Sequence, residues 1–226
     1  MVYKRYFKRI LDVVLALTAL LILSPFFVII LVVLAIIGKH PLFFTQERIG
    51  YKNKVFKIIK LNTMYKNADN GGINSLSTDS DTRVIPFRRF LRKTKIDELP
   101  QLLHVLKGSM SIVGARPQMP VDFRKYAPEV QKHIYDTLPG ITGIGSIIFR
   151  NEEKWISKAN GDKHAFYREH ISPYKGSVEL WYQNNISLKN DILIIIVTAF
   201  VLIYPKSELV YKIFKDLPPK PEVFNC

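Results

Sequence analysis

The most pronounced pattern in the sequence is a long apolar segment close to its N-terminus. From Leu11 to Ile37 the one charged residue is Asp12, and the only other polar side chains are Thr18 and Ser24. A helical membrane span needs about 20 predominantly apolar residues, so this segment is long enough to lie in a bilayer. A cleaved signal peptide fits less well, because its apolar region should end after about 7–15 residues at a small-residue site. The pattern therefore predicts a membrane-embedded helix.

Two features bear on whether this helix crosses the bilayer. Basic residues flank it on both sides: Lys4, Arg5, Lys8 and Arg9 precede it, and Lys39, Arg48, Lys52, Lys54, Lys57 and Lys60 follow it. Because basic flanks tend to stay on the cytoplasmic face, both ends favour the same side. Ser24-Pro25 also interrupts the segment, since proline removes a backbone hydrogen bond and collides with the preceding turn. A re-entrant helix broken at Ser24 and Pro25 is slightly favoured over an ordinary span with a proline kink.

Beyond this segment the chain becomes soluble in character. Phe43 to Met64 suggests a strand or short hairpin, and Asn67 to Asp81 is rich in Gly, Asn, Ser and Asp, which predicts a mobile loop. Four leucines then recur at helical spacing, and Pro100 is tolerated only in a first turn, so a helix should begin close to Asp97.

The remaining segments give weaker signals. Pro117 pushes Arg116 out of helical geometry, so this arginine should be presented from an extended backbone. A basic amphipathic helix is expected next, and contact with a membrane surface and packing on the core are about equally favoured for it. A later apolar run is too short to span and predicts an interfacial or buried helix. In order, we expect an irregular stretch at Gly108–Pro117, the amphipathic helix at Val121–Leu138, a turn at Pro139–Gly145, the short apolar helix at Ile192–Tyr204 and an irregular tail at Lys206–Cys226.

Composition and charge narrow the class of protein. The 226 residues exceed a typical single domain by about half, which indicates one domain with an appended segment. A hydrophobic fraction of 48% and a net charge of +14 exclude a disordered acidic chain and a polytopic transporter. The basic surface should attract nucleic acid, acidic lipid or phosphate-bearing substrates. Cys226 is the single cysteine, so no intramolecular disulfide can form and a reducing, cytoplasm-facing setting fits best.

Candidate chemistry lies where a basic run meets two adjacent carboxylates. The run alone would indicate a helix face on acidic lipid. Asp97 and Glu98 fall at the start of the predicted helix, where they could serve merely as a cap and a dipole partner. A phosphate bound there would also meet backbone N–H groups and guanidinium groups. The basic residues are Arg83, Arg88, Arg89, Arg92, Lys93 and Lys95.

Several short motifs occur in the order typical of one enzyme family. The chain resembles the bacterial sugar transferase family, and more closely its small monotopic phosphoglycosyl transferases, the undecaprenyl-phosphate sugar phosphotransferases. The resemblance runs from the basic N-terminus to about Asp191, and its Asp-Glu-Leu-Pro-Gln block with the later Arg-Pro is highly specific. The motifs are Lys60–Met64, Asp79–Arg83, Phe90–Lys93, Asp97–Leu102, Gly114–Pro117 and Pro139–Gly143.

The resemblance implies an enzyme that transfers a sugar-1-phosphate from a UDP-sugar to polyprenol (undecaprenyl) phosphate and releases UMP. Such a reaction is the first membrane step of polysaccharide or glycoconjugate biosynthesis. The expected location is the cytoplasmic face of the bacterial inner (plasma) membrane. The expected partners are the UDP-sugar, polyprenol phosphate and the lipid bilayer, with downstream glycosyltransferases as compatible further partners and no nucleic acid.

The resemblance also implies roles for individual residues. Asp97 would be the nucleophile that forms a covalent phospho-sugar intermediate, and Asp97 and Glu98 would hold Mg²⁺. Ser24 and Pro25 would break a re-entrant membrane helix. Including Arg88 from the basic run, the expected substrate-binding residues are Lys60, Arg88, Arg92, Arg116 and Pro117.

Three positions depart from the family pattern and leave nucleotide contacts in question. Asn62 stands where an arginine is common, Ser109 where an aspartate is common and Ala115 where a proline is common. The stretch from Phe149 to His170 resembles an insertion and is where sugar specificity is expected.

These features together predict an α+β, predominantly helical, monotopic membrane protein with interfacial amphipathic helices around a small cytoplasmic catalytic core. Residues 1–38 would form the re-entrant helix with its basic N-terminus, 39–191 the catalytic domain, and 192–226 the apolar interfacial helix and tail. The rival interpretations are a membrane-tethered nucleic-acid-binding protein and a non-catalytic basic scaffold. Charge reversal at Asp97 would be harmless in both rivals and fatal to the enzyme.

Overall fold

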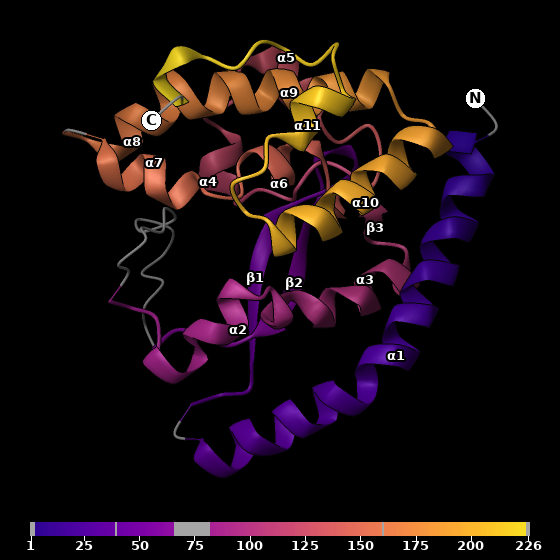
Figure 1. The fold of residues 1–226 in the computed structure, drawn as a ribbon, viewed down its shortest axis with the longest axis vertical. Coiled ribbons are helices and arrows are strands. Elements are labelled where there is room, and N and C mark those ends of the chain that lie inside the picture. Colours follow the sequence, from indigo (N-terminus) through magenta and orange to yellow (C-terminus); the bar gives the residue numbers. More distant parts are fainter. Residues whose placement is uncertain (1–2, 39, 66–81, 160, 225–226) are drawn as a thin grey trace.

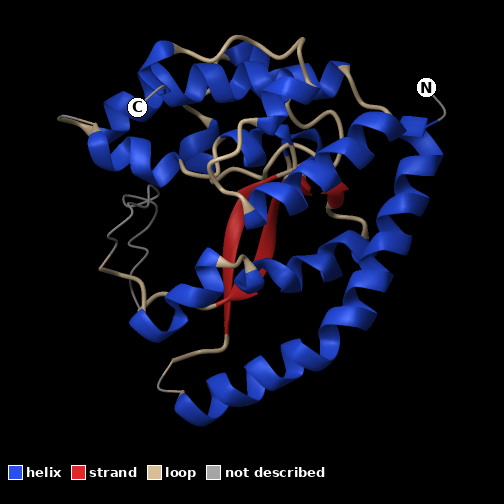
Figure 2. Cartoon of the chain, viewed as in Figure 1, coloured by secondary structure: helices blue, strands red, loops and turns tan. Residues whose placement is uncertain are grey.

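The computed structural model describes residues 3–38, 40–65, 82–159 and 161–224 (Figure 1). Lys39, the loop expected at Asn67–Asp81 and Cys226 lie outside these described residues. Helices predominate around two small sheets (Figure 2), in agreement with the expected α+β class. In chain order the α-helices and strands, with the 3-10 helix η4 among them, are α1 (Lys8–Ile37), β1 (Phe43–Ile49), β2 (Val55–Leu61), α2 (Arg89–Lys93), η4 (Ile96–Gln101), α3 (Leu102–Lys107), β3 (Ser111–Val113), α4 (Pro120–Phe123), α5 (Pro128–His133), β4 (Gly140–Thr142), α6 (Ile144–Ile148), α7 (Glu152–Lys158), α8 (Lys163–Phe166), α9 (Ser172–Asn184), α10 (Leu188–Ile203) and α11 (Leu209–Ile213).

Strands β1 and β2 form an antiparallel hairpin near the centre of the molecule (Figure 1). The pairing runs from Phe43 opposite Leu61 to Ile49 opposite Val55, so of the two predicted alternatives, a strand or a short hairpin, the hairpin is confirmed. The same register places Lys60 of β2 opposite Phe44 of β1. Two residues of β2 are buried in separate apolar clusters: Ile58 in one cluster and Leu61 in another.

Strands β3 and β4 pair in parallel in segments where the sequence predicted irregular backbone and a turn. Those two expectations are wrong because strands of three residues are too short to show an alternating pattern. The pairing depends on two glycines, since a Cβ atom on Gly140 would overlap the backbone of Gly114. Gly114 donates to the Thr142 carbonyl, and Gly140 donates to the Ala115 carbonyl, both at 2.9 Å. This close approach fixes the backbone that leads into Arg116.

The prediction of a single amphipathic helix at Val121–Leu138 is also wrong. Two short helices, α4 and α5, replace it, because Pro128 cannot continue the preceding helical ladder and instead begins α5. Of the two environments considered for this segment, the structure shows core packing. Its apolar side chains form a buried cluster with β1, consisting of Ile49, Ala115, Phe123, Tyr126, Val130, Ile134 and Tyr135.

The C-terminal helices pack together into the largest apolar cluster. In α10 one face is buried through Ile194 and Val197, while Ile196 and Ile203 on the other face are exposed. The helix is therefore buried on one side and presents apolar side chains on the other. The expectation of an irregular tail is wrong for its described part, which contains α11 and the buried Phe224, because its apolar side chains complete this cluster.

Helix α1 is long and apolar enough to cross a membrane, as judged by length and composition, and no other described helix meets that criterion. It changes direction along its course in Figure 1. Pro25 lies inside the helix and cannot donate to the carbonyl of Leu21. The Ser24 hydroxyl donates to that same carbonyl at 3.3 Å. The backbone hydrogen-bond ladder of α1 is therefore interrupted at Pro25, and the Leu21 carbonyl accepts from Ser24 instead.

Both halves of α1 contact the same body of the protein. In the first half, Ala16 is buried in a cluster with Ile58 and Val105. In the second half, Leu34 is buried against Leu61 and Leu91. The outward side chains along the helix are apolar and exposed, among them Leu17, Leu21, Ile22, Phe26, Ile29, Val33 and Ile36.

A buried polar cluster fastens the start of α1 to α10. The Lys8 ammonium donates to Asp191 Oδ2 at 2.6 Å and to the Val113 carbonyl at 2.8 Å. Tyr182 donates to Asp191 Oδ1 at 2.7 Å, and Tyr3 donates to Oδ2 at 2.6 Å. Lys8 and Asp191 are both buried, so each charge depends on the other.

Replacing Lys8 with methionine should therefore destabilise the protein. The substitution leaves the Asp191 carboxylate buried without its cation, at a cost of about 3 kcal/mol, the lower end of the usual range because two tyrosines still donate to it. Thermal unfolding in detergent measures the loss. The matched control is Lys52→Met, which breaks an exposed ion pair with Asp136 and should leave the midpoint unchanged. Equal midpoints for both variants would show that the cluster does not stabilise the fold.

Candidate active site

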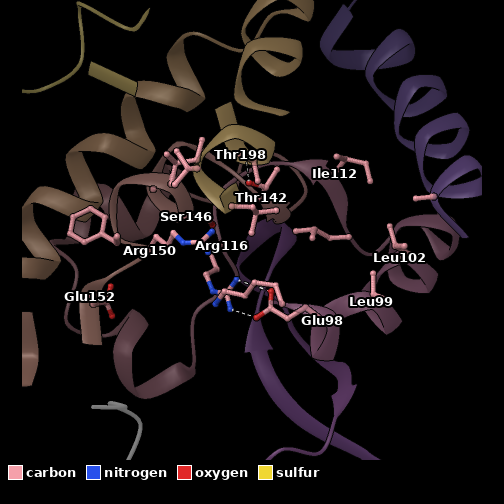
Figure 3. A pocket seen from close by; sticks show the side chains of 18 of the residues that line it. Glu98, Leu99, Leu102, Ile112, Arg116, Thr142, Ser146, Arg150, Glu152 and Thr198 are labelled. Atoms are coloured by element: carbon pink, nitrogen blue, oxygen red, sulfur yellow. Dashed lines mark hydrogen bonds and ion pairs between the residues drawn. The ribbon is translucent and has the colours of Figure 1, made fainter. Parts of the chain in front are cut away.

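A cavity of about 440 Å³ lies beside β3 and β4, bordered by α1, α3, α6 and α10. In Figure 3, Arg116 and Arg150 stand on one side of it, while Leu102 and Ile112 stand on the other. Ala19 of α1 and further apolar side chains from α10 extend the apolar side. The cavity thus joins a charged wall to a wall made partly by the long apolar helix.

Glu98 is the most tightly held group on the charged wall. Arg116 binds it with two N–H groups, one to Oε1 at 2.6 Å and one to Oε2 at 3.2 Å, and Lys60 binds Oε1 at 3.1 Å. Three separate elements supply these residues: η4, the segment after β3, and β2. Burial alone would raise the pKa of Glu98, but Arg116 and Lys60 more than offset it and hold that pKa well below its usual range. Glu98 is therefore ionised and fixed in position.

Asp97 is adjacent in sequence but differs in environment. It is buried, and its Oδ1 atom has no hydrogen-bond partner among the described residues. Burial raises the pKa of the Asp97 carboxyl, and the charge of Glu98 raises it further. Lys60, Lys95 and Arg92 partly oppose that rise. The two adjacent residues therefore differ: the Glu98 carboxylate is ion-paired with Arg116 and Lys60, whereas the Asp97 carboxyl keeps one oxygen without a hydrogen bond among the described residues.

The local chain path explains how the two carboxylates are placed. Lys95 adopts a left-handed conformation (φ 60°) immediately before η4, which turns the chain away from α2. The first turns then form a 3-10 helix containing Pro100, and the α-helical part begins at Leu102. The helix start expected near Asp97 is confirmed to within a residue, although its first turns are tighter than an α-helix.

The other expected site residues have different positions. Arg92 forms an ion pair with Glu153 of α7 at 2.7 Å, so it bridges α2 to a segment at the cavity. Arg88 is buried and donates to the backbone carbonyl of Asn62 at 2.7 Å and to that of Pro41 at 2.9 Å. Through these two hydrogen bonds Arg88 links the segment that follows α1 to the segment that follows β2. Of the expected catalytic and substrate-binding residues, Glu98 and Arg116 line the cavity formed by the described residues. The others lie behind or beside that lining: Lys60, Arg88, Arg92, Asp97 and Pro117.

Pro117 and two arginines form a connected group beside Glu98. The Pro117 carbonyl accepts from Arg48 Nη1 at 3.2 Å. Burial and the charge of Arg116 lower the pKa of Arg48 to about 10. Arg48 was not among the residues expected from the sequence, because nothing in its local pattern distinguishes it from the other basic residues after α1.

The pKa of Lys60 is also lowered. Burial lowers it to about 8, and the charge of Glu98 opposes this shift.

Several charged residues on the cavity wall come from beyond β4. Arg150, Glu152 and Glu153 line the cavity and belong to the Phe149–His170 stretch, where sugar specificity was expected. Lys175 of α9 also lines it and binds Glu152 at 2.6 Å. Lys175 gave no sequence signal, because only the packing of α9 against α6 brings it to this wall.

The three departures from the family pattern lie away from the cavity lining. Asn62 contributes a backbone carbonyl to Arg88. Ser109 interacts with the His104 ring at 3.1 Å and with its backbone, and Ala115 is fully buried. In the described part of the chain, their effect on the cavity is therefore indirect.

The residues also permit a simple test for a divalent cation. No group of three or more His, Cys, Asp or Glu side chains suited to a metal exists among the described residues. Mg²⁺, however, is often bound by one or two carboxylates together with substrate phosphates and water. Asp97 Oδ1 is unengaged, and Glu98 Oε2 accepts one hydrogen bond, from Arg116, so both retain lone pairs for a cation. The donor set fits Mg²⁺ that arrives with a phosphate-bearing substrate.

Comparison with known proteins gives a consistent set of relatives. UDP-galactose-lipid carrier transferase of Erwinia amylovora is 30% identical over 213 residues, covering 88% of this chain and 41% of the relative. UDP-glucose:undecaprenyl-phosphate glucose-1-phosphate transferase of Escherichia coli (strain K12) is 33% identical over 199 residues, covering 87% and 40%. Exopolysaccharide production protein ExoY of Sinorhizobium fredii is 31% identical over 171 residues, covering 70% and 75%.

The first two of these relatives are longer proteins, and this chain spans about two fifths of their length. The family model described as bacterial sugar transferase matches residues 3–205, which include α1, the cavity and α10. Because the match covers most of the chain, and because Glu98 and Arg116 from two of the family motifs line one cavity, the chain belongs to the bacterial sugar transferase family.

Proposed function

We propose that this chain transfers a sugar-1-phosphate from a UDP-sugar to polyprenol phosphate and releases UMP. The observation that carries the proposal is the asymmetry of Asp97 and Glu98 beside a cavity with a charged and an apolar wall. The names of several relatives describe transfer from UDP-sugars or to undecaprenyl phosphate, which supports the same substrate classes. The reaction would begin assembly of a polysaccharide or glycoconjugate.

Asp97 would act as a covalent catalyst in two steps. Its free oxygen attacks the phosphorus that carries the sugar, and the bond between that phosphorus and the bridging oxygen of the nucleotide breaks, so UMP leaves with its electron pair. A phosphate oxygen of the acceptor lipid then attacks the same phosphorus and restores the aspartate carboxylate. One cavity can thereby serve a soluble donor and a membrane-bound acceptor in turn.

Positive charge must accompany the first step, because a carboxylate attacks an anionic diphosphate. Two unit charges 4 Å apart repel by roughly 4 kcal/mol at an effective dielectric constant of 20. Arg116, Lys60 and Arg92 would bind and orient the phosphates, with Glu98 keeping Arg116 and Lys60 in place. Mg²⁺ held by Asp97 and Glu98 would supply further charge neutralisation when bound.

The contacts of α1 support a monotopic arrangement, which we propose lies on the cytoplasmic face of the inner membrane. Its two halves pack on the same body, and its interruption at Pro25 lies between those contacts. A straight span would carry the second half away from that body. The apolar faces of α1 and α10 border the cavity, so a membrane-bound acceptor could reach it without leaving the bilayer.

The proposed reaction is tested by offering the purified full chain a panel of UDP-sugars with polyprenol phosphate and Mg²⁺. One or a few UDP-sugars should release UMP and yield a lipid-linked sugar diphosphate. A nucleic-acid-binding protein or a scaffold would release none. No UMP with any UDP-sugar would contradict the proposed function.

Replacement of Asp97 with asparagine should abolish turnover without unfolding the protein. The substitution preserves shape but removes the attacking carboxylate, so we expect a loss of at least about a thousandfold in kcat. The thermal midpoint should not fall, since burial and the charge of Glu98 disfavour the ionised Asp97 carboxyl and asparagine removes that charge. Asp136→Asn, at an exposed ion pair, is the matched control and should retain activity. Near-normal turnover of the Asp97 variant would exclude it as nucleophile.

The affinity for the UDP-sugar should fall as pH rises through about 8. Lys60 is charged below its folded-state pKa of about 8 and neutral above it, so it then stops neutralising phosphate and releases Glu98. KM for the UDP-sugar should rise several-fold between pH 7 and 9. Lys60→Arg keeps its charge throughout this range and should flatten the profile. The same rise in the arginine variant would show that another group titrates.

The topology can be tested with single cysteines in a Cys226→Ser background. Lys4 and Lys54 are exposed and lie on opposite sides of α1 in the sequence, so they report both flanks. In spheroplasts, Lys4→Cys and Lys54→Cys should both resist a membrane-impermeant thiol reagent and should react after lysis. Labelling of either residue before lysis would favour a helix that spans the bilayer.

A further inference from the structure

Arg150 is a cation of the cavity wall that the reaction described above does not use. It lines the cavity, it is half-buried, and its guanidinium has no hydrogen-bond or ion-pair partner among the described residues. Burial also lowers its pKa, so the charge is kept there at a cost. A half-buried guanidinium without a carboxylate partner is a site that an anion would complete.

The neighbouring Ser146 has a similar deficit. Its hydroxyl oxygen is buried, lacks a hydrogen-bond partner in the described structure, and belongs to a residue of the cavity wall. The helical turn of α6 continues past its end, because Phe149 donates to Gly145 and Arg150 donates to Ile147. Ser146 and Arg150 are therefore four residues apart on one face, and Figure 3 shows both beside Arg116.

The other charged groups of the wall are already matched or exposed. Glu98 is bound by Arg116 and Lys60, Glu152 by Lys175, and Glu153 by Arg92. Lys95 also lines the cavity, but it is exposed to solvent. The described wall thus contains one half-buried cation, Arg150, without a counter-ion.

The position of Arg150 indicates which anion would bind. Asn151 beside it donates to the carbonyl of Pro205, just beyond the end of α10. Leu202 at that end of α10 lines the cavity, and Ile203 next to it is exposed and apolar. Lys60, in contrast, reaches Glu98 from β2. Arg150 therefore lies where the charged wall meets the apolar end of α10, as a phosphate attached to an apolar chain requires.

We propose that Arg150, with the Ser146 hydroxyl, forms the subsite for the phosphate of the acceptor lipid. Its prenyl chain would lie along Leu202 of α10 and Leu23 of α1. The assignment rests on the proposed function and divides the cavity between two phosphate-bearing substrates. The donor diphosphate would use Arg116 and Lys60, while the acceptor phosphate would use Arg150.

The test compares the two half-reactions in Arg150→Met, which removes the charge and retains a long apolar side chain. With UDP-sugar alone, UMP released per enzyme in the first turnover should stay within about twofold of wild type. With acceptor varied, KM for prenyl phosphate should rise roughly tenfold or more, as expected for one lost charge-assisted hydrogen bond. The increase should be similar for a short and a long prenyl chain, because the lost contact is with phosphate.

Two further variants and a control complete the design. Arg150→Lys should recover part of the acceptor affinity, and Ser146→Ala should raise the same KM by a smaller factor. Lys154→Met removes an exposed cation of α7 outside this cavity and should change neither parameter. Thermal midpoints verify that each variant is folded.

The outcomes separate this inference from the proposed function. An unchanged acceptor KM in folded Arg150→Met, or an equal loss in the donor half-reaction, would overturn the acceptor subsite while wild-type turnover stands. If wild-type protein releases no UMP with or without acceptor, the proposed function itself fails, and the subsite with it.

Discussion

The ionised carboxylate of Glu98, buried where three chain segments meet, is the constraint on which the site depends. A charge removed from water must be matched closely, and here a bidentate arginine and a lysine match it. Arg116 can reach Glu98 because Gly114 and Gly140 let β3 and β4 approach, and Lys60 can reach it because of the β1–β2 register. The geometry of the charged wall therefore depends on both sheets.

The same constraint separates the behaviour of two adjacent carboxylates. Arg116 and Lys60 stabilise the ionised form of Glu98 and hold its pKa well below the usual range. Burial and the charge of Glu98 raise the pKa of Asp97. Pairs of titratable groups pushed in opposite directions often have different chemical roles. Here the held carboxylate orients cations, and the other keeps a free oxygen toward which a phosphorus atom could be brought. Asp97 is thus the proposed nucleophile because Arg116 and Lys60 bind Glu98 and leave an oxygen of Asp97 without a hydrogen bond among the described residues.

The sequence predicted the features that depend on long or local patterns. The apolar α1 with its Ser-Pro interruption, the β1–β2 hairpin and the helix start near Asp97 are all present. Strands β3 and β4 were missed because three residues carry no periodicity, and the helix expected at Val121–Leu138 was wrong because Pro128 divides it. Arg48, Arg150 and Lys175 reach the site through tertiary packing, which local spacing does not encode. Arg88 shows the converse, since a basic run placed it near the site whereas its guanidinium binds backbone carbonyls.

The central claim is that the unengaged oxygen of Asp97 bonds to the phosphorus of the sugar phosphate. Its most direct test is mass spectrometry of the wild-type protein quenched after incubation with UDP-sugar and Mg²⁺ in the absence of acceptor. The account predicts a mass gain of one sugar phosphate on the peptide that contains Asp97, and its loss after polyprenol phosphate is added. A protein that turns over normally with acceptor but gains no mass, or gains it on a different peptide, would contradict the account.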